Sequence, residues 1–216
     1  MPVYPAVMIL AGVAATWGSS RLGRGLVALA VVWLAGATLW VHPHYLSYFN
    51  ELIGGPARGH LYLADSNLDW GQDLKRLAAY AQRHPTEAIK LAYFGSADPT
   101  HYGFACRSLP SFLPFGKPAD LDAGTYVVSA NQLLGIYEPS ATDAFWSPQQ
   151  VEEYRALTRV EAAGRAARRN AEEYYQFLRR GRLLNQLQRR PPDERIGYSL
   201  FVYRLTQPDL DALLRP

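Results

Sequence analysis

The chain is poor in the residues that build most metal and nucleophilic sites. Its 216 residues include one cysteine, Cys106, and five histidines. One thiol excludes an internal disulfide framework and a zinc site made of cysteines, so we expect Cys106 to be an unpaired, partly buried thiol. The histidines show no paired ligand spacing apart from His42 and His44. A glycine-rich phosphate loop and a serine-centred nucleophile elbow are also missing, so the sequence supports neither of these common enzyme classes.

Charge is almost missing from the start of the chain. Residues 3–17 and 25–41 form uncharged runs of 15 and 17 residues. Both are slightly shorter than the ~20 residues that cross ~30 Å of hydrocarbon, but uncharged flanking residues extend each run. A pair of buried helices in a soluble protein is the alternative, although neither run shows a polar face. We predict a two-span transmembrane hairpin over residues 1–44.

The charged side chains of this region, Arg21 and Arg24, lie in the connector between the two runs. Positively charged connectors stay in the cytoplasm, so the N-terminus and all residues after Val41 are predicted to lie outside. Trp17 and Trp40 stand at span ends, where the membrane interface favours aromatic rings. A signal peptide does not fit, because no Lys or Arg precedes the first run and a second run follows it. A hairpin in this orientation looks like the last two spans of a longer protein.

One acidic stretch organises the rest of the chain, namely residues 65–74 with the sequence DSNLDWGQDL. It follows an apolar run at residues 60–64, which we interpret as a strand, and it precedes an amphipathic helix pattern at residues 74–83. Turns between strands and helices carry the ligand-binding and catalytic residues of many α/β folds. Three carboxylates, an Asn and a Gln within nine residues are more than an ordinary turn needs. We call residues 65–73 the acidic turn.

Two interpretations of the acidic turn compete. Asp65, Asn67 and Asp69 have the alternate spacing of a calcium loop, but Trp70 stands where an EF-hand needs glycine. A looser divalent-cation site that uses Asp65 and Asn67 stays open. Alternatively, Asp69 caps the following helix together with Gln72, as in a capping box. Capping leaves Asp65, Asn67 and Trp70 unexplained, so we predict that they form part of a site.

The remainder of the chain, residues 45–216, is predicted to be an α/β domain. Residues 89–94, 125–130 and 198–205 have the composition and flanking turns of strands, residues 74–83 form a helix, and residues 99–123 read as loop. Strands that alternate with helices favour a parallel or mixed sheet with helices packed on it. The fold class is therefore α/β, with the membrane hairpin in front of a small extracytoplasmic domain.

Polar clusters follow three of the predicted strands. In a parallel sheet such clusters meet in one crevice beyond the carboxyl ends of the strands. The alternative is that loops are polar in any case. The residues we predict to bind a ligand there are Asp65, Ser66, Asn67, Trp70, Asp98, Ser129 and Asn131.

A basic helical insertion is predicted at about residues 147–190. It holds ten arginines against five glutamates, a local net charge of +5 in a protein of net charge +3. Binding to nucleic acid does not suit an extracytoplasmic domain, whereas anionic lipid headgroups attract basic side chains by ~1 kcal/mol each. The alternative is a solvated helical hairpin with stabilising Glu–Arg pairs. The predicted membrane-surface residues are Arg165, Arg168, Arg169, Arg179, Arg180 and Arg182.

Several motifs together resemble one known protein family. They are PHYLSYFNE at residues 43–51, GGP at 54–56 and the acidic turn, followed more weakly by YFG at 93–95, GTYVVS at 124–129 and IGYSL at 196–200. This pattern is similar to the C-terminal part of bacterial glycosyltransferases that use polyprenyl-phosphate-linked sugars. These are the multi-span relatives of protein O-mannosyltransferases and of the lipid A aminoarabinose transferase, within the GT-C superfamily.

The resemblance implies a place in the bacterial inner membrane, with the C-terminal domain on the outer face. It also implies two partners, a polyprenyl-phosphate sugar and either the missing N-terminal spans or a partner membrane subunit. Family members carry their catalytic carboxylate in the first extracytoplasmic loop, so no residue here inherits that role. We expect the membrane-anchored C-terminal portion of such an enzyme. The alternative is a non-enzymatic, membrane-anchored module that binds a cation or a carbohydrate as an accessory subunit.

Overall fold

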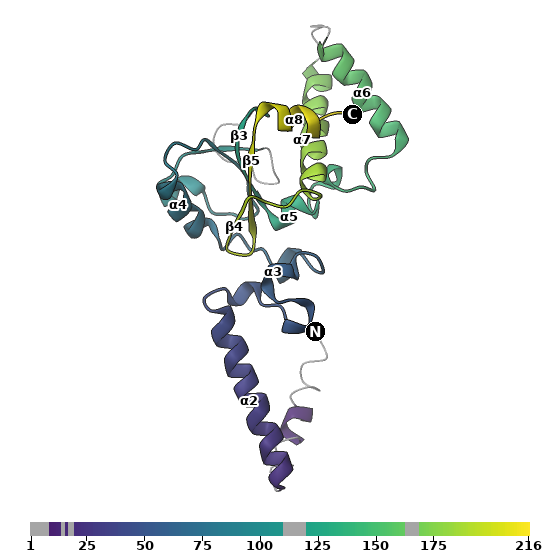
Figure 1. Cartoon of the computed structure of the whole chain (residues 1–216). Coiled ribbons are helices and arrows are strands. Elements are labelled where there is room, and N and C mark those ends of the chain that lie inside the picture. Colours follow the sequence, from purple (N-terminus) through teal and green to yellow (C-terminus); the bar gives the residue numbers. More distant parts are fainter. Residues whose placement is uncertain (1–8, 14–15, 17–19, 110–119, 163–168) are drawn as a thin grey trace. The chain divides into compact units, whose positions relative to one another are not determined.

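The structure, a computed structural model, describes residues 9–13, 16, 20–109, 120–162 and 169–216. The chain divides into two compact units, residues 1–45 and residues 46–216 (Figure 1).

The first unit contains the long apolar helix α2, Arg21–Val41. Ser20 caps its start, since the Ser20 hydroxyl oxygen accepts a hydrogen bond of 2.9 Å from the Gly23 N–H. Among the described residues, α2 is the one helix long and apolar enough to cross a membrane. The other predicted span, residues 3–17, lies mostly outside the described residues. Residues 9–13 of this run are described and are helical. The structure therefore shows one candidate span, and the predicted two-span hairpin is not shown.

The second unit is built on a mixed five-stranded sheet in the order β2-β1-β3-β5-β4. β1 pairs in parallel with β2 and β3, whereas β5 pairs antiparallel with β3 and β4. The strands are β1 (Ile89–Ala92), β2 (Cys106–Ser108), β3 (Gly124–Ser129), β4 (Glu194–Ile196) and β5 (Leu200–Leu205). The predicted strands at 89–94, 125–130 and 198–205 are confirmed with small differences at their ends. The predictions missed β2 and β4, because three-residue strands are too short to show alternation.

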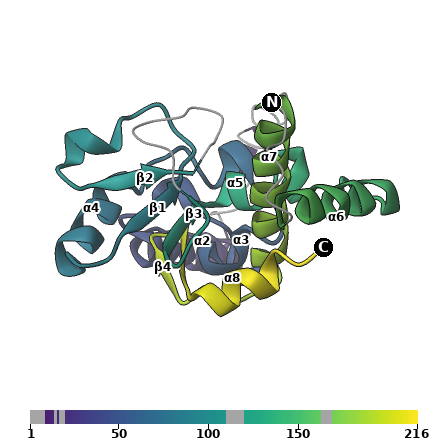
Figure 2. The same cartoon turned by 90° about the horizontal axis from the view of Figure 1, so that it is seen from above.

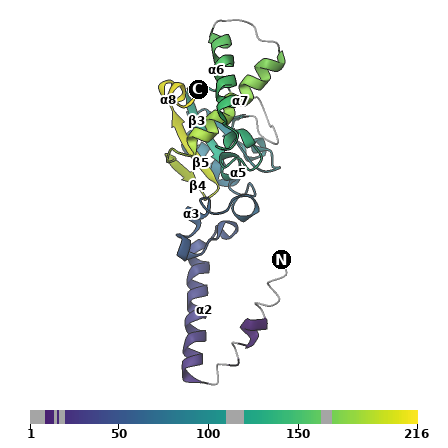
Figure 3. The ribbon, with the colours of Figure 1, turned by 90° about the vertical axis from the view of Figure 1, so that its right-hand side faces the viewer.

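Helices cover both faces of this sheet. Helix α4 (Leu74–Arg83), at the predicted position, buries Leu74 and Leu77 against one face. The helices α5 (Ala130–Leu133), α7 (Arg169–Leu187) and α8 (Gln207–Leu213) contribute to the core on the other face. Side chains alternate along β3 accordingly, with Val127 in the α4 core and Val128 in the opposite core. Helix α6 (Pro148–Ala162) packs on α7, on the side away from the sheet (Figures 2 and 3).

Short helical turns make up most of the segment before α4. They are η2 (Tyr45–Ser47), η3 (Glu51–Ile53), α3 (Pro56–Gly59) and η4 (Asp65–Asn67). Two further short turns occur later, η5 (Pro99–Tyr102) and η6 (Pro139–Ala141).

The predicted strand at residues 60–64 is wrong. The N–H groups of Leu61, Tyr62 and Leu63 bond back to the carbonyls of Arg58 and Gly59, so the chain continues to turn after α3. All three of these side chains are more than half exposed. An apolar run without a buried face gains nothing from strand pairing, because strand propensity reflects packing on a half-buried sheet.

Candidate functional site

Asp69, in the middle of the acidic turn, is completely buried. Its carboxylate accepts hydrogen bonds from the Gly71 N–H (3.0 Å) and the Asn131 N–H (3.3 Å), the latter at the start of α5. Burial raises the pKa of Asp69 to about 6, although these two N–H groups oppose the rise. The prediction that Asp69 caps α4 is wrong. Asp73 occupies that N-cap position, and the Asp69 carboxylate instead satisfies backbone donors of a distant segment.

Asp73 closes the acidic turn and is also buried. Its carboxylate accepts from the Ser199 hydroxyl (2.8 Å), the Ser199 N–H (3.2 Å) and the Tyr198 N–H (3.3 Å). The Arg76 guanidinium donates to the other carboxylate oxygen at 2.7 Å. Asp73 therefore ties the acidic turn to the connection between β4 and β5.

Asn131 joins the start of the acidic turn to its middle. Its Oδ1 accepts from the Asp65 N–H at 2.7 Å, and its Nδ2 donates to the Asp69 carbonyl at 3.1 Å. Asn131 and Ser129 are both fully buried. The acidic turn thus meets the carboxyl end of β3, as the crevice prediction expects, but Asn131 supports the turn from inside the protein and Ser129 is buried beside it.

The outer face of the acidic turn combines polar groups with aromatic rings. Ser66, Asn67 and Trp70 are exposed, Asp65 is half-buried, and Trp70 is 59% exposed. The Trp70 indole N–H donates to the Ser66 carbonyl at 2.8 Å, which fixes the ring against η4. Asp65 has a left-handed backbone with φ 56°.

Tyr137 completes this face, and the sequence reasoning missed it. Its hydroxyl donates to Asp65 Oδ1 at 2.9 Å, and this bond raises the pKa of the Tyr137 phenol. The ring stacks on Phe94, with centroids 5.0 Å apart and planes at 8°. Tyr137 follows Asp65 by 72 residues, and no local motif marks it. We call Asp65, Ser66, Asn67, Trp70 and Tyr137 the turn face.

Asp98 has a local role. Its Oδ1 accepts from the Thr100 N–H (2.9 Å) and the Thr100 hydroxyl (2.8 Å), which caps η5 and lowers the pKa of the Asp98 carboxyl. Its described hydrogen bonds do not reach the turn face. Of the seven residues predicted to bind a ligand, four lie on the turn face, Ser129 and Asn131 lie beneath it, and Asp98 caps η5.

The predicted cation site has few donors. Among the described residues, no three His, Cys, Asp or Glu side chains are placed to share a metal ion. The two predicted ligands are Asp65 and Asn67, and the Asp65 carboxylate already accepts from Tyr137. Ca²⁺ takes about six to eight oxygen ligands, so these two side chains supply a minority of such a shell.

The described arginines of the basic helices contact the protein itself. Arg180 pairs with Glu138 at 2.7 Å, and both side chains are largely buried. Arg182 donates to the Arg215 carbonyl and lies over the Trp146 ring, while Arg179 lies over a tyrosine ring. Arg165, Arg168 and the side chain of Arg169 lie outside the described residues. The membrane-facing role of these helices stays a prediction.

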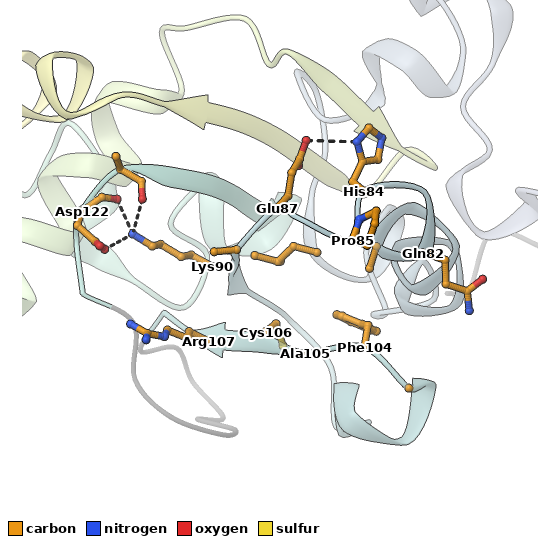
Figure 4. A pocket seen from close by; sticks show the side chains of 15 residues that line it. Gln82, His84, Pro85, Glu87, Lys90, Phe104, Ala105, Cys106, Arg107 and Asp122 are labelled. Atoms are coloured by element: carbon orange, nitrogen blue, oxygen red, sulfur yellow. Dashed lines mark hydrogen bonds and ion pairs between the residues drawn. The ribbon is translucent and has the colours of Figure 1, made fainter.

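A pocket of about 600 Å³ lies between the amino ends of β1 and β2 and the end of α4 (Figure 4). The sequence reasoning missed it. The buried Lys90 amino group points to one end, where it bonds to the Asp122 carboxylate and main-chain oxygens. The Cys106 thiol lies along the wall as a free, partly buried cysteine, as predicted. Burial raises its pKa to about 11, so the thiol is protonated at neutral pH and is a poor nucleophile.

Comparisons of this chain with protein-family models, with curated proteins and with solved structures found no match.

Proposed function

We propose that this chain is the membrane-anchored C-terminal portion of a glycosyltransferase that uses a polyprenyl-phosphate-linked sugar, without the catalytic part. In this proposal α2 is the anchor and the α/β domain lies on the outer face of a bacterial inner membrane. The turn face binds the sugar on the donor or on the acceptor. Catalytic spans on another part of the enzyme or on a partner subunit supply the reacting carboxylate.

The observation that carries the proposal is the chemistry of the turn face. Sugars present hydroxyl groups at their edges and apolar C–H faces above and below the ring. Carboxylate and amide groups, here those of Asp65 and Asn67, hydrogen-bond hydroxyls, and exposed rings, here Trp70 and Tyr137, cover C–H faces. These rings are held in place by hydrogen bonds to η4, so little side-chain freedom is lost on binding.

The buried half of the acidic turn supports a binding role over a catalytic one. Asp69 and Asp73 accept hydrogen bonds from the chain itself, which positions η4 against the end of β3 and beside the β4–β5 connection. Buried carboxylates that only hold the turn face in place suit a binding or accessory domain. In this proposal the buried residues of the acidic turn hold it in place, and its outer face binds the sugar.

Membrane anchoring is supported by α2 and by the segment that follows it. α2 exposes apolar side chains along its length, including Leu29, Trp33 and Leu39. In the second unit Leu46, Leu52 and residues 61–63 are more than half exposed. Apolar and aromatic side chains that follow a span within about twenty residues are typical of membrane interfaces.

Calorimetric titration of the full chain in lipid nanodiscs tests the proposal. The ligands are short-chain polyprenyl phosphates that carry mannose, glucose or 4-amino-4-deoxyarabinose, with the sugar-free polyprenyl phosphate for comparison. We expect one glycosylated lipid to bind more tightly than the sugar-free lipid. Trp70→Ala should lower the ratio of the affinities for the glycosylated and the sugar-free lipid about tenfold, because a stacked ring contributes ~1 kcal/mol or more.

Tyr102→Ala is the matched control, since Tyr102 is an exposed ring outside the acidic turn. Asp65→Asn keeps the shape of the turn face and should weaken sugar binding several-fold. Identical affinity for glycosylated and sugar-free lipids would contradict the proposal. A calcium-dependent rise in melting temperature that Asp65→Asn abolishes would assign the turn face to a cation instead.

A further inference from the structure

A second pocket, of about 370 Å³, lies away from the turn face and shares no residue with it. Its wall comes from the turn after α3, the end of α5, the chain that follows α7, and the strands β4 and β5. The residues that matter for its chemistry are His60, Arg189, Arg190, Arg195, Phe201 and Tyr203. No acidic side chain is among its described lining residues.

Arg195 is the main source of positive charge in this pocket. Its guanidinium donates to the Ala57 carbonyl at 2.6 Å and lies over the Phe201 ring, 5.2 Å from the ring centre. Among the described residues it makes no ion pair with a carboxylate. A guanidinium has five N–H donors, so this contact leaves donors available for a ligand.

The two other arginines are only partly neutralised. Arg190 pairs with Asp209 at 3.2 Å, and Arg189 pairs with Asp143 at 2.7 Å. Both members of the second pair are more than half exposed, and exposed pairs contribute little. An anion in the pocket can therefore compete for Arg189 at small cost.

The remaining wall is apolar and aromatic. Phe201 contacts the His60 ring, with centroids 5.0 Å apart, and Leu61 lines the mouth while 67% exposed. Burial, and then the charge of Arg195, lower the pKa of His60, so His60 is neutral at pH 7. Tyr203 and Gln188 already donate to main-chain carbonyls. The arginines are thus the donors that face a ligand.

A cationic pocket with an apolar wall matches an anion that is attached to a hydrocarbon chain. Arginine binds phosphate oxygens through paired N–H groups, which gives both affinity and geometry. Free inorganic phosphate would leave the apolar wall in contact with water, whereas a lipid chain would cover it. We infer that this pocket binds the phosphate group of a phosphate ester on a hydrocarbon chain, with the chain leaving past Leu61.

The phosphate of a lipid then binds at a site separate from the turn face. It rests on the proposed function only in expecting a membrane-resident ligand. Because the pocket and the turn face share no residue, variants of Arg195 and of Trp70 separate the failure of one idea from the failure of the other.

The test uses the full chain in detergent micelles and four probes: farnesyl monophosphate, dihexanoyl phosphatidic acid, farnesol and inorganic phosphate. We expect the two phosphate-bearing lipids to bind at least about tenfold more tightly than farnesol and than inorganic phosphate. Arg195→Gln should weaken the binding of both phosphate-bearing lipids about tenfold, since hydrogen bonds to charged groups contribute ~1.5–3 kcal/mol. Arg159→Gln, which removes an exposed arginine of α6, should leave binding unchanged.

Preference for farnesyl monophosphate assigns the pocket to an isoprenoid carrier, and preference for phosphatidic acid assigns it to a bilayer lipid. Arg195 is exposed, so Arg195→Gln should keep the wild-type melting temperature. His60→Gln is a second variant, in the turn after α3. Equal affinity of wild type and Arg195→Gln for both lipids overturns the inference. So does binding of farnesol as tight as that of farnesyl monophosphate.

Discussion

The Asp73 carboxylate accepts hydrogen bonds from both the hydroxyl and the N–H of Ser199, a residue 126 positions further along the chain. This contact joins the start of α4 to the beginning of β5 and buries a charge between them. Gly197, two residues before Ser199, passes directly beside the same carboxylate.

Gly197→Ala should destabilise the protein strongly. A β-carbon at this position would collide with the Asp73 carboxylate, and the backbone has φ 62°, where side chains are strained by ~1–2 kcal/mol. We expect a melting temperature at least ~6 °C below the wild type. Gly103→Ala is the control, because Gly103 has φ 74° with open space around it and should lose only ~3 °C. Equal losses for the two variants would remove the role of the Asp73 contact.

Asp69→Asn should change how stability depends on pH. The pKa of Asp69 is about 6 in the folded protein against 3.8 in the unfolded chain. Between these values the folded protein holds a proton that the unfolded chain releases, so the contribution of Asp69 to stability falls as the pH rises from 4 to 6. Asparagine cannot titrate, so the stability of Asp69→Asn relative to wild type should rise over this window by ~2 kcal/mol.

Asp98→Asn is the control with the opposite sign. The pKa of Asp98 is lowered by hydrogen bonds from Thr100, so its contribution is present above pH 4 and is lost as the pH falls below that value. The measurement is denaturant unfolding at several pH values. Parallel pH profiles for wild type and Asp69→Asn would contradict the raised pKa of Asp69.

Arg180→Ala should destabilise the protein by ~3–5 kcal/mol, because it leaves the buried Glu138 carboxylate without its partner. Adding Glu138→Gln to Arg180→Ala removes the stranded charge and should recover part of the loss. Arg159→Ala, on the exposed side of α6, should change stability by less than ~0.5 kcal/mol. These values come from thermal or denaturant unfolding. A neutral Arg180→Ala variant would return Arg180 to the predicted membrane-facing set.

Cysteine labelling tests the orientation of α2. In a Cys106→Ala background, Ser20→Cys lies at the start of α2 and Ala79→Cys lies on the exposed side of α4. The charges of Arg21 and Arg24 predict that position 20 is cytoplasmic and position 79 is outside. An impermeant thiol reagent should therefore label position 79 in intact cells and position 20 only after permeabilisation. Labelling of position 20 alone would reverse the orientation.

Local patterns predicted the elements that bury a regular face. Leu74 and Leu77 recur at helical spacing, and α4 begins and ends where that pattern and the following His84-Pro85 place it. The strands β1, β3 and β5 are apolar runs between turn residues, and their central strand is buried on both faces. The apolar run at residues 60–64 shows the limit of such patterns. It resembles a strand in composition, but in the part of the chain that the structure describes no strand pairs with it, and it turns instead.

The acidic turn shows why half of the candidate site could not be read locally. An Asp followed three residues later by Gln predicts a capping box wherever the Asp stays near the helix that follows. The sheet brings distant segments beside the turn. The Asp69 and Asp73 carboxylates therefore accept hydrogen bonds from donors 62 and 126 residues away instead of capping that helix. The same holds for Tyr137, which reaches Asp65 from the segment between α5 and η6. Composition indicated a polar, aromatic turn after an apolar run, whereas the pairing of β1 with β3 and of β3 with β5 determined which of its groups are buried and which are exposed.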